Sequence, residues 1–147
     1  MNYQYYFVQM FIFEIILGVL LLLSVLFIWF NNSYLDQVQF FKNNTKAKVI
    51  FRIIFTFFLM DFFFTFTMPF IKDKKIIDTN TYYEINGIAT YGIVNGGAMG
   101  LSKSIIVQVD DKEYEFSVAW ADSNIEKGSK VKVTYLPNSK YAVVELE

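Results

Sequence analysis

The sequence predicts an α+β protein: a two-helix transmembrane hairpin over residues 1–75, followed over residues 76–147 by a small soluble β-barrel with five antiparallel strands of the OB or SH3-like kind. Three observations lead to this fold. Residues 6–30 and residues 49–71 are both apolar runs long enough to cross a bilayer, which takes about 20 residues. From residue 76 onwards the apolar residues alternate at period two, as they do in half-buried strands.

The first apolar run contains Gln9 and Glu14 as its clearly polar residues. A cleaved signal sequence has a basic start and a short apolar core, whereas residues 1–5 contain no Lys or Arg and the core here is long. We therefore expect a membrane span. Trp29, near its end, is typical of an interfacial anchor.

The connector, residues 31–48, is polar and becomes basic towards its end. Leu35, Val38 and Phe41 recur about every three residues behind Ser33, a candidate helix cap. Two structures fit this pattern: a short helix at the membrane surface, or a helical extension of the first span. The second span is expected to stop after Pro69, where a charged stretch begins at Lys72.

Basic residues near the span ends predict the orientation, because the side richer in Lys and Arg tends to stay in the cytoplasm. The first span has none before it and four within or beside the connector: Lys42, Lys46, Lys48 and Arg52. This favours an external N-terminus. The charges around the second span nearly balance, because Lys72, Lys74 and Lys75 beyond it oppose the connector. We expect an external N-terminus and, after two spans, an external barrel on a bacterial cell membrane. Arg52 is expected to extend towards the lipid headgroups.

The carboxylates within the apolar runs are the candidate functional residues. Asp61 lies near the middle of the second run, where an ionisable side chain is costly. Glu14 is predicted to lie at a similar depth. The two could share a proton, or each could contact a basic residue or polar backbone of another membrane protein. Alternatively each is tolerated, with Asp61 bonded to the Thr65 hydroxyl or the carbonyl of Phe57. Gly18 would let a neighbouring helix approach Glu14.

Five strands are predicted in the C-terminal part, with closure into a barrel that removes exposed edges. Trp120 follows the third strand and is either a contact residue on the rim or part of the packing at the barrel end. The glycine-rich residues 95–101 are expected to form a flexible inter-strand loop, since the Lys and helix of a phosphate-binding loop are missing. The predicted strands are residues 88–95, 104–109, 113–119, 130–136 and 141–146.

Three sequence segments in this part carry a family resemblance: GIATYGIV from Gly87, IVQVDDKEY from Ile106, and IEKGSKVKVTYLPNS from Ile125. Together they resemble the DUF3592-type domain of bacterial membrane proteins and, more loosely, the OB-fold tail of NfeD-like proteins. The resemblance covers only the last 65 or so residues. It implies a membrane-tethered β-module that works through contacts, and no catalytic residues carry over from it.

Composition argues against several classes of function. The chain has no His and no Cys, which removes the commonest general base, the commonest metal ligand and all thiol chemistry. Its net charge of −1 gives no electrostatic reason to bind nucleic acid. We expect no enzymatic activity, no cofactor and no metal. The expected partners are membrane lipid and a membrane or secreted protein, and oligomerisation is left open.

The function expected from the sequence is that of a non-enzymatic bacterial membrane protein acting by protein–protein contact. Self-protection against a secreted toxin or bacteriocin is one form that suits a small two-span protein with an external module. A regulatory or assembly subunit of a membrane complex is the first alternative. A small oligomeric channel or proton pathway through Glu14 and Asp61 is the second.

Overall fold

The computed structural model describes residues 2–95 and 103–147. They form two compact units: residues Ile12–Pro69, and residues Met1–Phe11 together with Phe70–Glu147. The first unit is helical. The second contains the β-barrel and also the outer ends of the two long helices, which lie in residues 1–11 and from residue 70 onwards.

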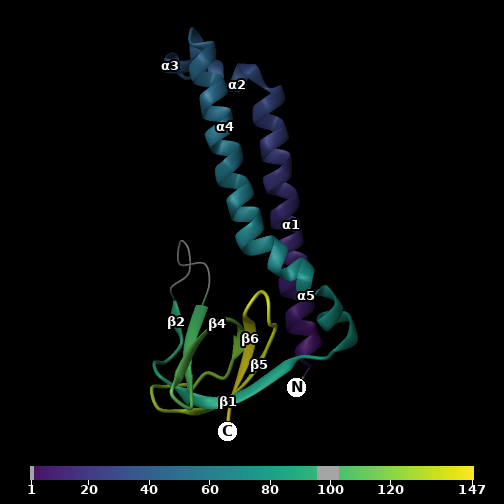
Figure 1. The fold of residues 1–147 in the computed structure, drawn as a ribbon, viewed down its shortest axis with the longest axis vertical. Helices are drawn as coiled ribbons and strands as arrows, with labels where there is room; N and C mark the ends of the chain where they lie inside the picture. The colour runs from purple at the N-terminus through teal and green to yellow at the C-terminus, as the bar shows by residue number, and fades with distance from the viewer. Residues whose placement is uncertain (1, 96–102) are drawn as a thin grey trace. The chain divides into compact units, whose positions relative to one another are not determined.

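The helical unit is built from two long helices joined by a connector (Figure 1). Helix α1 covers Tyr3–Phe30, and a continuous helix of 35 residues covers Thr45–Thr79. Both are long and apolar enough to cross a membrane, by length and composition. The continuous helix consists of α4 (Thr45–Phe62), the π-helical segment η1 (Phe63–Thr67) and α5 (Met68–Thr79).

The connector contains two short helices, α2 (Asn32–Asp36) and α3 (Gln39–Lys42), so it is neither a single helix nor an extension of α1. The predicted cap, Ser33, lies inside α2. Asn31 is the cap instead, because its side-chain oxygen accepts a hydrogen bond from the Tyr34 N–H. Asn44 caps α4 in the same way by accepting from the Ala47 N–H.

The sequence predicted that the second long helix stops after Pro69. This is wrong, because the helix continues to Thr79. Proline lacks an N–H and normally breaks the regular hydrogen-bonding pattern of a helix. The turn before Pro69 is widened into η1, in which the Met68 N–H donates to the Phe63 carbonyl five residues earlier. This wider turn accommodates the proline, and the charged stretch from Lys72 becomes part of α5 rather than a loop.

The C-terminal strands form a closed barrel in the order β1-β5-β6-β4-β3, with β3 returning to pair with β1. The short β2 adds to the outer edge of β3. A five-stranded Greek-key barrel with this connectivity is an OB fold. The strands are β1 (Tyr83–Ala89), β2 (Val94–Asn95), β3 (Lys103–Val109), β4 (Lys112–Ala121), β5 (Lys130–Tyr135) and β6 (Tyr141–Leu146).

The prediction that all strands are antiparallel is wrong for one pair, because β4 and β6 run parallel. The hairpins β3–β4 and β5–β6 are antiparallel, as expected for strands joined by short turns. The β4–β6 pair joins strands that are not consecutive in the sequence. Their relative direction follows from barrel closure, which no local pattern reveals.

The first predicted strand, residues 88–95, was also misplaced. Strand β1 begins at Tyr83 and pairs with β5 up to Ile88, where it turns to pair with β3. Gly87 makes this turn feasible, since a Cβ atom there would lie 2.5 Å from Cγ1 of Val107 and 2.6 Å from the carbonyl of Gln108. The glycine marks the corner where the barrel closes, and not the beginning of the strand.

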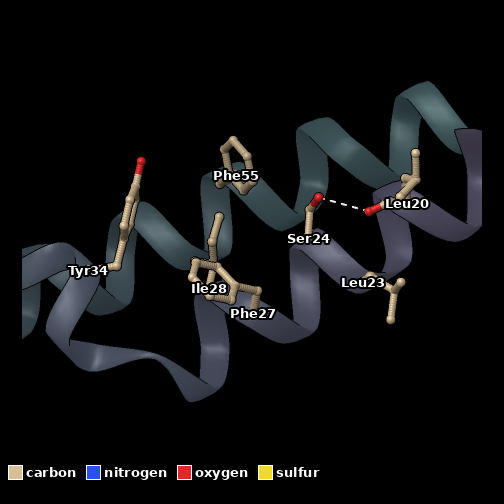
Figure 2. Close-up of a pocket in the computed structure, with 7 residues that line it drawn as sticks. All are labelled: Leu20, Leu23, Ser24, Phe27, Ile28, Tyr34 and Phe55. Carbon is tan, nitrogen blue, oxygen red and sulfur yellow. Dashed lines mark hydrogen bonds between the residues drawn. The ribbon is translucent and has the colours of Figure 1, made fainter.

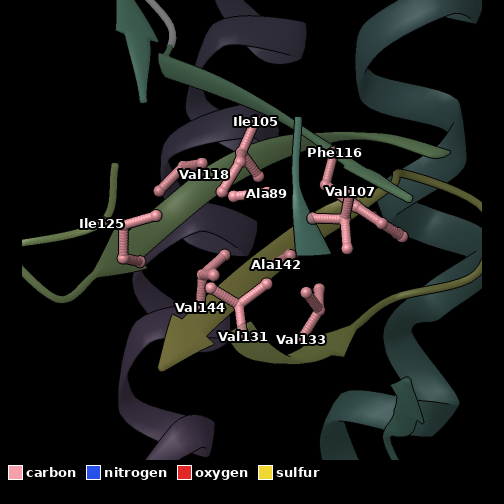
Figure 3. Close-up of a cluster of buried hydrophobic side chains, with 10 residues drawn as sticks. All are labelled: Ala89, Ile105, Val107, Phe116, Val118, Ile125, Val131, Val133, Ala142 and Val144. Carbon is pink, nitrogen blue, oxygen red and sulfur yellow. The ribbon is translucent and has the colours of Figure 1, made fainter. Parts of the chain in front are cut away.

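Inside the barrel, ten side chains form one hydrophobic core (Figure 3). Strand β6 contributes Ala142 and Val144 to it, while Val143 between them points to the opposite face. All three are fully buried because both faces of β6 are covered. The core residues are Ala89, Ile105, Val107, Phe116, Val118, Ile125, Val131, Val133, Ala142 and Val144.

A second hydrophobic cluster covers the outer face of β6 within the same unit. Its buried members come from the start of α1, from α5 and from the end of the barrel: Phe7, Phe70, Ile77, Leu136 and Val143. The N-terminal turns of α1 and the C-terminal turns of α5 are therefore packed against the barrel wall. Asp73, between two of these α5 residues, is fully buried as well.

Candidate functional site

Asp61 lies on the exposed side of α4 near its C-terminal end, which is the middle of the continuous helix Thr45–Thr79, and its neighbours in the sequence are apolar. Within residues 2–95 and 103–147 it takes part in no hydrogen bond or ion pair. The expected local bonds to the Thr65 hydroxyl and the Phe57 carbonyl are absent from the described residues, and Thr65 is itself exposed. Asp61 is thus a carboxylate whose surroundings within the hairpin do not compensate its charge.

Helix α4 and the π segment have an inner face that packs against α1. Arg52 and Leu59 are buried on this face, Thr56 bonds to α1, and Phe63 and Thr67 approach Gly18. At 100° per residue, Asp61 is turned by about 160° from Leu59. Asp61 therefore points away from α1.

Glu14 occupies the opposite kind of environment, because only 5% of its surface is exposed. Its Oε2 atom is buried without a hydrogen-bond partner among the described residues. One turn further along α1, Gly18 allows close contact with η1: a Cβ there would lie 2.7 Å from Cγ2 of Thr67. The Thr67 hydroxyl also reaches the Glu14 backbone carbonyl at 3.5 Å. Gly18 therefore has the role expected of it, with the π segment as the helix that approaches.

Glu14 and Asp61 are not brought together as a pair. Glu14 is buried and Asp61 is exposed on the face turned away from α1, and no hydrogen bond among the described residues links them. A similar depth along the two predicted spans does not place two side chains together, since the rotation of each helix about its axis also decides where its side chains point. The arrangement gives no geometry for a shared proton.

Arg52 packs at the end of α1 instead of extending away from the hairpin. The residue is 9% exposed, and its Nε–H donates to the Ile28 carbonyl at 2.9 Å. Ile28 lies in the last turn of α1, where carbonyls lack partners within the helix. The guanidinium also lies 5.9 Å from the centre of the Trp29 ring, whose N–H donates to the Thr56 hydroxyl. Arg52 thus stabilises the C-terminal end of α1 electrostatically.

The two remaining candidates from the sequence have local partners within the barrel unit. Gln9 is exposed, and its side-chain amide donates to the Tyr5 hydroxyl one turn earlier at 2.7 Å. Trp120 lies within β4 and packs against the second hydrophobic cluster, with its ring 5.7 Å from that of Tyr6. Its position fits a packing role better than that of a free contact residue.

A groove of about 630 Å³ lies along the hairpin, lined by α1, α2 and α4 (Figure 2). The Ser24 hydroxyl, one of its few polar groups, already donates to the Leu20 carbonyl in the same helix. The lining is thus suited to hydrocarbon and offers little to orient a polar ligand. The lining residues are Leu20, Leu23, Ser24, Phe27, Ile28, Tyr34 and Phe55.

Within the part of the chain that the structure describes, no group of three or more acidic side chains is arranged to hold a metal ion. Of the predicted glycine-rich loop, residues 95–101, Asn95 belongs to β2 and the other residues lie outside the described part of the chain, so the loop stays a prediction. No protein-family model, curated protein or solved structure matches the chain. The resemblance to DUF3592-type and NfeD-like domains accordingly also stays a prediction.

Proposed function

We propose that this chain is an integral membrane protein that acts by binding another protein, and that Asp61 is the centre of the contact within the membrane. The observation that carries the proposal is the exposed position of Asp61 on α4, without a partner among the described residues. An ionisable side chain at the centre of a span costs about 2.5 to 3.5 kcal/mol on insertion scales. Contact with a polar group of a second protein would offset that cost.

The arrangement favours contact over conduction. A proton pathway through both carboxylates needs them to face a common route, whereas Glu14 is enclosed and Asp61 points away from α1. Glu14 instead lies beside the closest packing of the hairpin, near Gly18 and Thr67. Its place is in the internal structure of the hairpin, and the contact function falls to Asp61.

The proposal includes a bacterial cell membrane, two spans and an external barrel. The basic residues of the connector support this orientation by their number. An external barrel would suit protection against a secreted toxin or bacteriocin, whereas an internal one would suit a regulatory or assembly subunit. Knowing the side of the barrel therefore separates these two forms of the same contact function.

The contact is tested by purifying the tagged full-length protein from its native membranes in mild detergent and quantifying the proteins that come with it. A protein that binds at Asp61 should be enriched with the wild type and lost with Asp61→Leu. Thr65→Leu is the matched control, since it also removes an exposed polar group from the same long helix. Co-purification that is indifferent to Asp61→Leu would contradict a role for this carboxylate.

The side of the membrane on which the barrel lies is tested with a single introduced cysteine, because the natural chain has none. Asp111 is exposed in the β3–β4 turn and is a suitable position. Intact cells carrying Asp111→Cys should react with a membrane-impermeant maleimide if the barrel is external. Reaction only after lysis would reverse the proposed orientation.

A further inference from the structure

We infer that the outer face of α4 and η1 is a docking surface for one transmembrane helix of another protein, and that this helix carries a Lys or Arg opposite Asp61. The inference rests on the proposed contact function and names the chemical class of its partner. Three features support it: the spacing of the exposed residues, the single carboxylate among them, and the charges that this chain can offer.

The exposed residues on this face follow a heptad pattern. Asp61 is preceded by Ile50, Ile54 and Phe57 and followed by Phe64, with alternating spacings of four and three residues. The four apolar members are each more than half exposed. At 100° per residue, the four positions within α4 fall within a stripe about 60° wide along the helix, and Phe64 follows them in η1. We call this stripe, residues 50, 54, 57, 61 and 64, the outer seam.

A seam with this spacing is the pattern by which two helices pack side by side over several turns. Apolar side chains every three and four residues fit between those of a neighbouring helix. A single polar residue in such a seam fixes the register, because only one alignment gives it a partner. Asp61 has this position, with one apolar seam residue about a turn before it, Phe57, and one about a turn after it, Phe64.

The seam is also distinct from the surface that holds the hairpin together. The α1-facing residues Arg52, Thr56 and Leu59 lie at angles centred about 210° away from the middle of the seam. Packing of a further helix on the seam would leave the internal contacts of the hairpin in place. The hairpin therefore does not have to open to bind a partner.

Charge selects the occupant. A second copy inserted with the same orientation would place Asp61 opposite Asp61, which brings like charges together in a medium of low dielectric constant. Arg52, the basic residue in the second span, is directed towards the end of α1. Lipid chains give no partner to a carboxylate. A Lys or Arg in another helix neutralises Asp61 and donates hydrogen bonds to it.

The binding test uses the full-length protein in phosphatidylcholine vesicles, with a fluorescent donor on the single cysteine of Lys46→Cys. The probe is a synthetic leucine-rich transmembrane helix with one Lys at its midpoint and an acceptor at one end. Energy transfer should show that this helix binds about tenfold more tightly than a twin with Leu in place of Lys. In Asp61→Leu, the two helices should bind equally weakly.

Two exchanged variants provide matched controls of unchanged composition. Met60→Asp with Asp61→Met turns the carboxylate by about 100° from its natural position and places it outside the seam, and binding of the Lys helix should be lost. Phe57→Asp with Asp61→Phe keeps the carboxylate on the seam but moves it one turn. This variant should prefer a probe helix whose Lys is moved by about one turn as well.

Two outcomes would overturn the inference. Equal binding of the Lys and Leu helices to the wild type would show that charge does not select the partner. Energy transfer between two labelled copies that disappears in Asp61→Leu would show that the seam takes a second copy. If the inference fails while a protein still co-purifies in an Asp61-dependent way, the proposed contact function stands. If that co-purification is absent too, both fall.

Discussion

The carboxylate of Asp73 accepts two hydrogen bonds from Asn138, one from its side-chain amide at 2.6 Å and one from its backbone N–H at 3.2 Å. The Ser139 N–H donates to the other carboxylate oxygen at 2.7 Å. Asp73 is fully buried in α5, and its partners form the β5–β6 turn. One side chain thereby joins the helix to the turn that precedes β6, within a single compact unit.

Removing this carboxylate should destabilise the barrel unit. Asp73→Ala leaves three donors without their acceptor, and we expect a loss of about 3 kcal/mol in the free energy of unfolding. The measurement is a denaturant titration in detergent micelles followed by the fluorescence of Trp120, with Trp29 replaced by Phe. Asp78→Ala is the control, because Asp78 is an exposed acid of the same helix that pairs with Lys74. Equal losses for the two variants would contradict the role of Asp73.

The burial of Asp73 could not be predicted from the sequence. In the sequence it stands among Lys72, Lys74 and Lys75, a combination that is typical of a solvated segment. Its burial depends on the continuation of the helix beyond Pro69, which in turn depends on the wider turn of η1. Neither could be derived from a pattern of apolar residues. The second hydrophobic cluster was missed for the same reason, since it needs α5 to exist.

The features that were predictable have a strong local signal. Long apolar runs gave the two candidate spans, and period-two alternation gave the strands around Val107, Phe116, Val133 and Val144. Asp61 was found because a carboxylate is conspicuous in an apolar run. Its exposure was not predictable, because the sequence does not fix how α4 is rotated against α1. The parallel β4–β6 pair likewise depends on contacts between distant segments.

Gly87 should be intolerant of any side chain. Gly87→Ala would place its Cβ against Val107 and the backbone carbonyl of Gln108, and we expect a loss of about 2 kcal/mol or more. Val107→Ala in the same chain should restore only part of the stability, since the carbonyl cannot be trimmed. Gly128→Ala, where the added atom meets open space but φ is +87°, should cost about 1 kcal/mol. The same denaturant titration ranks the variants, and a harmless Gly87→Ala would contradict the tight closure of β1 on β3.

Tyr82 makes the barrel unit sensitive to alkaline pH. Burial raises the pKa of Tyr82 above its usual value of 10.0, and its hydroxyl has no hydrogen-bond partner among the described residues. Because the folded state holds this proton more tightly than the unfolded state, stability is complete below pH 10 and falls as the pH rises towards the folded-state pKa.

Tyr82→Phe should therefore weaken the alkaline loss of stability and leave the fold intact at neutral pH. Its ring still fills the space beside Phe7, 4.7 Å away between ring centres. The melting temperature of the two proteins measured between about pH 8 and pH 11 tests this. Tyr114→Phe, a substitution at an exposed tyrosine of β4, is the control. Parallel curves for wild type and Tyr82→Phe would rule out the contribution of Tyr82.

Glu14 should cost the hairpin stability. Its buried Oε2 lacks a partner among the described residues, so an apolar side chain of similar size is expected to do better there. We expect Glu14→Met to raise the free energy of unfolding in mixed detergent micelles by about 1 to 3 kcal/mol, followed by circular dichroism. Ile16→Met, at an exposed position of the same helix, should leave it nearly unchanged. A destabilised Glu14→Met would mean that the carboxyl group has a partner in the folded protein.

Gly18→Ala should destabilise the hairpin by a steric clash with Thr67, and a second substitution at Thr67 should relieve that clash. Gly18→Ala would bring its Cβ to 2.7 Å from the Thr67 methyl carbon, Cγ2, and Thr67 is only 1% exposed and has little room to move. We expect a loss of about 1 to 3 kcal/mol in the same micelle experiment. Thr67→Ser removes that methyl group and keeps the hydroxyl, so the double variant Gly18→Ala with Thr67→Ser should recover most of the loss. Thr67→Val, which keeps the bulk and removes the hydroxyl, should not rescue Gly18→Ala. Rescue by Val instead of Ser would show that the hydroxyl, and not the methyl group, limits the approach of the two helices.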